Sequence, residues 1–414
     1  MAYSFRTGDQ TLVREINLSI ILNTLREAAP LSRAQLAART GLNKTTVSSL
    51  VHELTDRQFV REIGYGHSSS GGRPAMMLEL NPQAGCIIGV EIGVDFILVI
   101  LTDFTAHVLW RWQEEISPGQ TPETILNQAV NATRTAISHH ETSASAQGNS
   151  PLLGIGVGIP GLVDIASGVV IFAPNLGWRD VLAREVFTAA FDVPIFMDND
   201  ANAAAMGEHY FGAAQHVHDF VYLAAGVGLG GGIVLNGQLY RGRGGCAGEI
   251  GHMTILPDGE LCNCGNRGCW ETLVSPVAVI RRVRQAIESG KPSLISRLAN
   301  DDLRRISVPL IAQAARAGDE VARQALEETG EYLGIGIANL INAFDPELVV
   351  FGGVLSFASD FLLPVIETTI RQRAMVRRRA LPQVKVSAHG FDACVMGCVA
   401  LVLHDILREP RQNS

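Results

Sequence analysis

The sequence has no long uninterrupted apolar run and no secretory leader pattern. Its most apolar stretch, 86–101, is interrupted by Glu91 and Asp95, and no charged segment followed by an apolar one stands near Met1. These absences exclude the usual signatures of a membrane span and of an export signal. Only 18% of the 414 residues are charged, against 47% that are hydrophobic. We expect a cytoplasmic protein of two or three globular domains without a membrane partner.

Positive charge is scarce outside the amino-terminal segment. Residues 1–80 contain nine Lys and Arg against seven Asp and Glu, whereas the rest of the chain contains 24 against 34. The net charge of −8 is therefore divided into +2 for the first segment and −10 for the remainder. Because an acidic surface repels phosphates, contact with nucleic acid is expected only in residues 1–80.

The chain has seven cysteines, and three of them are gathered in one short segment. Three thiolates and one imidazole suit zinc and complete a tetrahedral site with no open position. Gly265 and Gly268 let so short a segment turn back around one ion. The alternative is a group of ordinary reduced thiols, since an intracellular protein needs no metal to carry them. The predicted ligands of a structural Zn²⁺ are His252, Cys262, Cys264 and Cys269.

The first 81 residues have the pattern of a winged helix-turn-helix domain. Apolar residues recur at helical spacing over 13–25, Ser32 starts a second helix that Gly41 ends, and Asn43 caps a third helix. Two strands joined by the segment 67–74 follow, as a wing requires. The alternative is a small helical module for protein contacts.

The third helix has an apolar face and a polar face with small side chains. Val47, Leu50, Val51 and Leu54 share the first face, so the second is free to approach the major groove of DNA closely. An arginine on a wing suits the minor groove or a phosphate. The predicted DNA-binding residues are Asn43, Lys44, Thr45, Thr46, Ser48 and Ser49 on this helix and Arg61 and Arg73 on the wing.

The rest of the chain predicts an α/β body with two lobes. Two glycine-centred hairpins, at 86–103 and 219–239, indicate one sheet per lobe, and strands alternate with helices such as 122–139 and 320–343. The low-complexity segment 138–151 is expected to be a surface loop. The arginine cluster 371–379 is expected to be a solvated helix face rather than a second nucleic-acid patch.

Polar residues at one strand end predict a ligand-binding corner. Asp198, Asn199 and Asp200 stand between an apolar strand and an alanine-rich helix, where a carboxylate can bind a sugar hydroxyl or, in a kinase, accept its proton. Plain helix capping is the alternative for these residues. Glu249 lies three residues before His252, and a metal ion nearby would hold such carboxylates in place.

Six motifs together resemble the ROK family of sugar kinases and sugar-responsive repressors over almost the whole chain. They are GIGVGIPGLVD (154–164), APNLGWRD (173–180), NDANAAAMGE (199–208), AGVGLGGGIVLNG (225–237), GEIGH (248–252) and CNCGNRGCWE (262–271). The amino-terminal winged helix is similar to that of the transcription-regulator branch, which includes xylose and N-acetylglucosamine repressors. The resemblance implies an actin/hexokinase-like (ribonuclease H-like) body with a zinc knuckle.

This resemblance also implies the domains and the sugar site. The expected domains are 1–81, a first lobe at 85–200 to which a carboxyl-terminal helix at 391–408 returns, and a second lobe at 201–390 with the zinc site and a dimer surface near 321–343. His252 is expected to serve metal and sugar together. The implied sugar-binding residues are Gly161, Asn175, Asn199, Asp200, Glu249, His252 and Glu271.

The sequence departs from the kinase members at the first hairpin. Where they carry an aspartate-glycine-threonine phosphate loop, this chain has bulk at Val94 and an added carboxylate at Asp95, which disfavour a triphosphate. We therefore expect no kinase activity, but a dimeric repressor of a xylose-, glucose- or N-acetylglucosamine-type operon that is released or modulated by its sugar. The alternatives are an ATP-dependent sugar kinase with an accessory DNA-binding head, in which Asp200 would be catalytic, and a sugar-insensitive scaffold.

Overall fold

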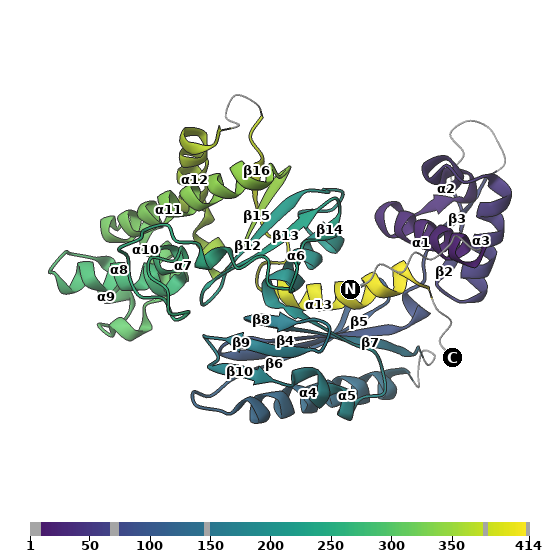
Figure 1. The fold of residues 1–414 in the computed structure, drawn as a ribbon, viewed down its shortest axis with the longest axis horizontal. Coiled ribbons are helices and arrows are strands. Elements are labelled where there is room, and N and C mark those ends of the chain that lie inside the picture. The colour runs from purple at the N-terminus through teal and green to yellow at the C-terminus, as the bar shows by residue number, and fades with distance from the viewer. Residues whose placement is uncertain (1–9, 67–73, 145–149, 376–379, 411–414) are drawn as a thin grey trace.

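A small helical head is joined to a larger α/β body with two lobes (Figure 1). The computed structural model describes residues 10–66, 74–144, 150–375 and 380–410. The head lies at one end of the molecule, beside the carboxyl-terminal helix α13 (Ala393–Arg408). This arrangement confirms the predicted fold class.

The head has the helices and the wing that the sequence predicts. The Ser32 hydroxyl accepts a hydrogen bond from the Gln35 backbone N–H, and Gly41 ends that helix with a φ of 73°. The Asn43 side chain caps the next helix by accepting from the Thr46 N–H at 2.8 Å. A three-stranded sheet of order β1-β3-β2 completes the domain. The elements are α1 (Gln10–Ala28), β1 (Leu31–Ser32), α2 (Arg33–Thr40), α3 (Lys44–Asp56), β2 (Val60–Tyr65) and β3 (Met76–Leu80).

Only one side of α1 enters the core of the head. Leu18, Ile21, Leu22 and Leu25 are buried there. Three other apolar residues of the same helical pattern, Val13, Ile16 and Ile20, are exposed by 52%, 49% and 37%. The small head has only enough core to cover one face of this helix. The spacing of apolar residues therefore predicted the helix correctly but did not show which of these residues are buried.

The first lobe is a five-stranded sheet with helices on both faces. Its strand order is β11-β7-β4-β5-β6, with β4, β7 and β11 parallel. Helices α4 and α5 cover one face, and strands β8, β9 and β10 form a separate small sheet of order β10-β9-β8. The elements are β4 (Cys86–Ile92), β5 (Phe96–Asp103), β6 (Val108–Glu115), α4 (Pro122–Ala144), β7 (Leu152–Ile159), β8 (Leu162–Asp164), β9 (Val169–Ala173), β10 (Trp178–Val181), α5 (Ala183–Ala190) and β11 (Ile195–Asn199).

The second lobe repeats the pattern of a sheet with covering helices. Its strand order is β14-β13-β12-β15-β16. The buried side chain of Trp270 packs beside helix α11, and its ring N–H donates a hydrogen bond to the Tyr332 carbonyl at 2.9 Å. The elements are β12 (Phe220–Ala225), β13 (Leu229–Leu235), β14 (Gln238–Leu239), α7 (Glu271–Val274), α8 (Pro276–Glu288), α9 (Leu294–Leu298), α10 (Val308–Arg316), α11 (Glu320–Phe344), β15 (Leu348–Gly353), α12 (Ser359–Arg373) and β16 (Gln383–Val386).

Two helices, α6 (Asp200–Phe211) and α13, cross in close contact between the sheets. A Cβ on Gly397 would lie 1.7 Å from the Ala203 carbonyl oxygen, and one on Gly156 would lie 2.0 Å from the Cys398 carbonyl oxygen. Glycine is therefore required for α13 to lie directly against both α6 and strand β7. The apolar core of the head is continuous with the core around these two helices.

Two sequence predictions need correction or reassessment. Residues 138–144, expected in a loop, extend helix α4, since no Gly or Pro interrupts them and Thr142 bonds to the Ser138 carbonyl; residues 145–149 lie outside the described part. The apolar side of 321–343 packs within the chain against α12, while its outward side is polar, so it provides no evidence for a dimer surface.

The arginine cluster agrees with its prediction where the structure describes it. Arg371 and Arg373 are exposed in the last turn of α12, as expected, and residues 376–379 lie outside the described part. By length and apolar composition α13 resembles a membrane span, but 67% of its span is buried inside the protein. This burial identifies it as a core helix.

Candidate functional site

A cavity of about 630 Å³ lies between the two lobes. Strands β4, β7 and β11 run parallel and end at it, as ligand sites at the carboxyl ends of such strands do. The structure brings all seven predicted sugar-binding residues to its wall: Gly161, Asn175, Asn199, Asp200, Glu249, His252 and Glu271.

The three polar residues at the junction of β11 and α6 have three different roles. Asn199 caps α6 by accepting from the Ala201 and Asn202 N–H groups and donates to the Gly161 carbonyl at 3.0 Å. Asp198 points away from the cavity and forms an ion pair of 2.7 Å with Arg241, which the sequence did not indicate. Asp200 is left to face the cavity. The capping alternative is thus correct for Asn199 only.

A buried carboxyl group, Glu91, and a half-buried one, Asp200, line the cavity together. Burial raises the pKa of Asp200 to about 6. Burial, together with the nearby charges of Asp200 and Asp392, raises the pKa of Glu91 to about 8. Near neutral pH this pair therefore presents one ionised group, Asp200, and one neutral group, Glu91.

The second lobe supplies the opposite wall. Glu249 and His252 lie on one short 3₁₀ turn, with 3.8 Å between a Glu249 oxygen and Nε2 of His252, which confirms their predicted proximity. Burial raises the pKa of Glu249. Glu271 is the first residue of α7 and also lines the cavity. Its Oε1 accepts a hydrogen bond from the Cys262 thiol at 2.9 Å, so Glu271 lies between the cavity and the cysteines.

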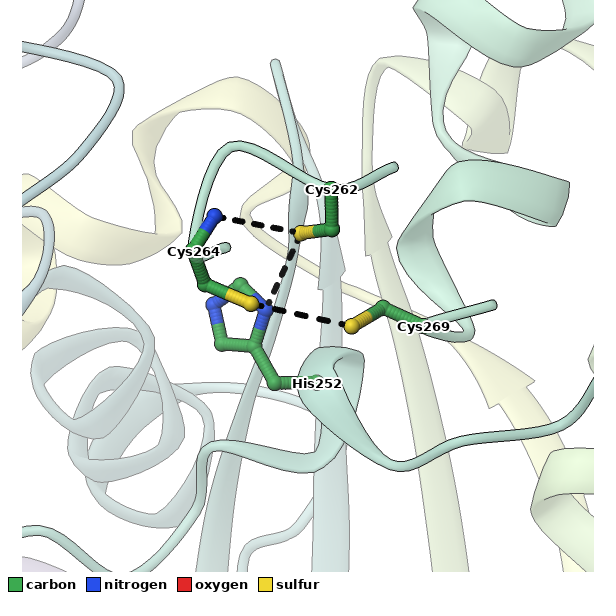
Figure 2. Close-up of side chains that lie close together, drawn as sticks. All are labelled: His252, Cys262, Cys264 and Cys269. Carbon is green, nitrogen blue, oxygen red and sulfur yellow. Dashed lines mark hydrogen bonds between the residues drawn. The ribbon is translucent and has the colours of Figure 1, made fainter. Parts of the chain in front are cut away.

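The four predicted metal ligands form one cluster beside this wall (Figure 2). Their ligand atoms all lie within 4.8 Å of one another. The Cys264 and Cys269 sulfurs are 3.7 Å apart, and the Cys262 sulfur is 3.6 Å from Nδ1 of His252. These separations match the edges of a tetrahedron with metal–sulfur bonds of about 2.3 Å. The side chains thus form a site that can hold a metal ion.

The predicted turn residues have the required conformation. Gly265 and Gly268 have φ values of +92° and +65°. A Cβ on Gly268 would lie 1.6 Å from the Leu256 carbonyl oxygen, so only glycine fits there. The sequence did miss one contact of this loop: the side chain of Asn263 donates to Oδ1 of Asn175 in the first lobe at 3.1 Å.

The cavity is acidic and has no cationic Lys or Arg among the described residues that line it. Five carboxyl groups line it: Glu91, Asp95, Asp200, Glu249 and Glu271. At the tip of the first hairpin, the ring of Phe96 folds over Gly93, with Val94 and Asp95 beside it. The carboxylates of this lining that are ionised near neutral pH disfavour phosphate groups.

The predicted DNA-binding face is largely open. Lys44, Thr45, Ser48 and Ser49 are exposed on α3, while the oxygen of Asn43 is used as a helix cap and Thr46 is half-buried. Arg61 is paired with Glu79 on the neighbouring strand at 2.6 Å, so its charge is already partly neutralised. Arg73 lies outside the described residues. Contact with DNA stays a prediction for all eight.

A helix-turn-helix head joined to a two-lobed body with a ligand cavity defines the class of ligand-responsive DNA-binding proteins. The ROK family model matches residues 87–405 and the model of the IclR helix-turn-helix domain matches residues 20–64. The chain belongs to the ROK family, which confirms the predicted resemblance.

Relatives and solved structures agree with this assignment. The chain is 39% identical to the putative xylose repressor of Caldicellulosiruptor sp. (strain Rt8B.4) over 97% of this chain and 99% of the relative. A ROK family transcriptional regulator, homologous to the E. coli MLC protein, has a TM-score of 0.81 at 29% identity, covering 96% and 97% of the two chains. A ROK family glucokinase from Streptomyces griseus, solved with glucose and AMPPNP, has a TM-score of 0.68 at 33% identity, covering 77% and 99%.

The raised pKa of Glu91 predicts how stability changes with pH. The folded protein keeps a proton on Glu91 that the unfolded chain loses above the ordinary pKa of 4.5, so stability falls as pH rises from there to about 8. This loss is on the order of 4 kcal/mol. Glu91→Gln should flatten the fall, measured as urea midpoints between pH 5 and 8. Glu123→Gln, on the surface of α4, should keep the wild-type slope; equal slopes for both variants would contradict the prediction.

Proposed function

We propose that this protein is a sugar-responsive transcriptional repressor whose effector is an unphosphorylated sugar. The observation that carries the proposal is the path of two helices, α6 and α13. Both begin at the cavity, with Asp200 and with Ala393 and Cys394, and both end at the head. A change at the cavity can therefore move the surface on which the head rests.

The contact between α6 and the head is specific. The guanidinium of Arg26 in α1 lies 4.3 Å from the ring centroid of Tyr210 and donates to its carbonyl at 3.2 Å. Burial lowers the pKa of His404 to about 4, and Nδ1 of its neutral ring is hydrogen-bonded to the Tyr210 hydroxyl oxygen at 2.7 Å. Tyr210 thus joins α6, α13 and the head.

A second contact follows α13. Arg57, at the end of α3, donates to the Pro410 carbonyl at 2.9 Å just after α13 ends. The end of α13 thus contacts the end of α3, which carries the predicted reading face, while the end of α6 contacts α1, which packs against α3. Sugar binding would shift the population of head orientations rather than create a new one.

The nature of the effector follows from the cavity wall. Carboxylate and amide groups bind sugar hydroxyls, whereas a sugar phosphate needs the Lys or Arg that the described lining lacks. The repressor name of the Caldicellulosiruptor relative makes xylose the first candidate. Glucose and N-acetylglucosamine are the others.

The metal would be a structural Zn²⁺. Three thiolates and one imidazole favour zinc and leave no open position for catalysis. His252 and Cys264 belong to both the ligand cluster and the cavity wall. The ion would hold that wall in place. The protein would act in the cytoplasm as a homodimer or dimer of dimers, because two heads on a palindromic operator supply affinity that one weakly basic head lacks.

A sugar kinase is the second candidate, and Asp200 favours it. A half-buried carboxylate with a pKa of about 6 at the start of α6 can accept a proton from a sugar hydroxyl. The first hairpin disfavours this function, since Val94, Asp95 and Phe96 stand where a phosphate loop would be. Loss of kinase activity is therefore part of the proposal.

One experiment separates the two functions. An operator is selected from random DNA duplexes by retention on the zinc-loaded protein, and retention is then measured with xylose, glucose, N-acetylglucosamine or ATP. We expect one free sugar to change operator retention, with no ADP released from ATP in its presence. Sustained sugar-dependent ADP release would identify a kinase, and failure to select any operator would favour a scaffold.

The helix path makes a prediction for Arg26. Arg26→Ala removes the contact with Tyr210 but touches neither the cavity nor the α3 face. Such contacts contribute about 1–2 kcal/mol, so the ratio of operator affinities without and with sugar should fall by roughly 5- to 30-fold. Sugar affinity should stay within about twofold. The control is Arg134→Ala, which removes a contact between an arginine of α4 and the ring of Phe191 and should leave the ratio unchanged. An unchanged ratio in Arg26→Ala would show that the contact between Arg26 and Tyr210 does not couple the cavity to the head.

A further inference from the structure

We infer that Asn263 is a positioning residue that turns the amide of Asn175 toward the sugar. The inference deepens the proposed function and rests on it. Asn263 stands between two metal ligands, Cys262 and Cys264, in the second lobe. Its side chain reaches across the cleft to Oδ1 of Asn175 at 3.1 Å.

The metal ligands would fix the place of Asn263. When sulfur atoms on both sides of a residue bind one ion, its backbone has little freedom left. The loop is also closed locally, since the N–H of Gly265 donates to the Cys262 carbonyl at 2.9 Å and that of Cys262 to the Asn266 carbonyl at 2.8 Å. Asn263 is exposed, so no packing of its own holds its side chain.

Asn175, by contrast, lies on a turn that is held only at its backbone. The N–H of Leu176 donates to the Ala173 carbonyl at 3.1 Å, and that of Gly177 donates to the Pro174 carbonyl at 3.4 Å. These bonds leave the side-chain amide free to rotate. The side chain of Asn263 is the hydrogen-bond partner that orients it.

The orientation decides what Asn175 offers to a ligand. Because Oδ1 of Asn175 accepts from Asn263, its NH₂ group is on the cavity side. Gly228 lines the cavity, and the position that a Cβ would take on it marks a point in the wall. The Asn175 nitrogen lies 3.3 Å from this point, and an oxygen of Glu271 lies 2.5 Å from it. A donor thus stands beside an acceptor, which is the pair that a sugar hydroxyl needs. With the amide reversed, two acceptors would face each other there.

The test compares two changes at one position with a control in the same loop. Asn263→Ala frees the Asn175 amide and should weaken sugar affinity roughly three- to tenfold, the effect of one hydrogen bond. Asn263→Asp offers only acceptors, so it should reverse the amide and weaken affinity further. Asn266→Ala, which loses a bond to Thr254 on the other side of the loop, should bind like the wild type.

Affinity is measured by calorimetric titration with xylose, glucose and N-acetylglucosamine, and zinc content by atomic absorption. We expect one zinc per chain in all four proteins. Wild-type affinity in Asn263→Ala, or an aspartate variant no weaker than the alanine variant, overturns the positioning role. Loss of zinc in Asn263→Ala also overturns it, since the residue would then act on the metal. If the wild type binds none of the sugars, the proposed function itself fails.

Discussion

Asp200→Ala should give a repressor that still binds its operator and no longer responds to sugar. Asp200 faces the cavity as the ionised member of its pair with Glu91, and Asn199 keeps the cap of α6 in its absence. Hydrogen bonds from a ligand to a charged group contribute about 1.5–3 kcal/mol each. Loss of two of them should weaken sugar binding by more than about 100-fold.

The measurement is operator retention at increasing sugar concentration, with calorimetry for the sugar itself. Asp258→Ala is the matched control, because Asp258 is an exposed carboxylate near the metal loop that does not line the cavity. It should respond like the wild type. Release of Asp200→Ala at wild-type sugar concentrations would show that the effector binds elsewhere.

Cys264→Ser should remove the metal and, with it, much of the stability of the second-lobe wall. Cys264 is one of four ligands, and a hydroxyl is a poor zinc ligand beside thiolates. Because metal binding contributes directly to the folding free energy, its loss should lower the melting temperature by about 2–4 °C for each kcal/mol lost. Sugar response should be lost as well, since His252 would no longer be held.

Zinc content, melting temperature and operator release are measured together. Cys246→Ser is the control: Cys246 is exposed and lies outside the cluster, so its removal should change none of the three. Normal zinc content with a normal sugar response in Cys264→Ser would show that the four side chains do not form the metal site.

Local patterns explain what could be predicted. The caps Ser32 and Asn43 and the turn glycine Gly41 act on residues within four positions along the chain, and the structure has all three. The four predicted metal ligands lie between His252 and Cys269, so their spacing was visible in the sequence as well. Where the determining contacts are local, the predicted geometry was found.

Long-range contacts explain what was missed. Nothing near Asp198 in the sequence indicates Arg241, and nothing near Arg61 indicates Glu79, although these partners decide which groups stay free. The exposure of Val13 on α1 likewise depended on how much core the head can offer.

The sequence by itself determined the winged-helix head, the α/β character of the body and the four side chains that form a cluster able to hold a metal ion. Each depends on periodicity, spacing or residue type within a short segment. Only the tertiary structure decided that α6 and α13 both run from the cavity to the head and that Asn263 meets Asn175 across the cleft. These depend on how sheets and helices distant in the chain pack together, and no local pattern specifies such packing.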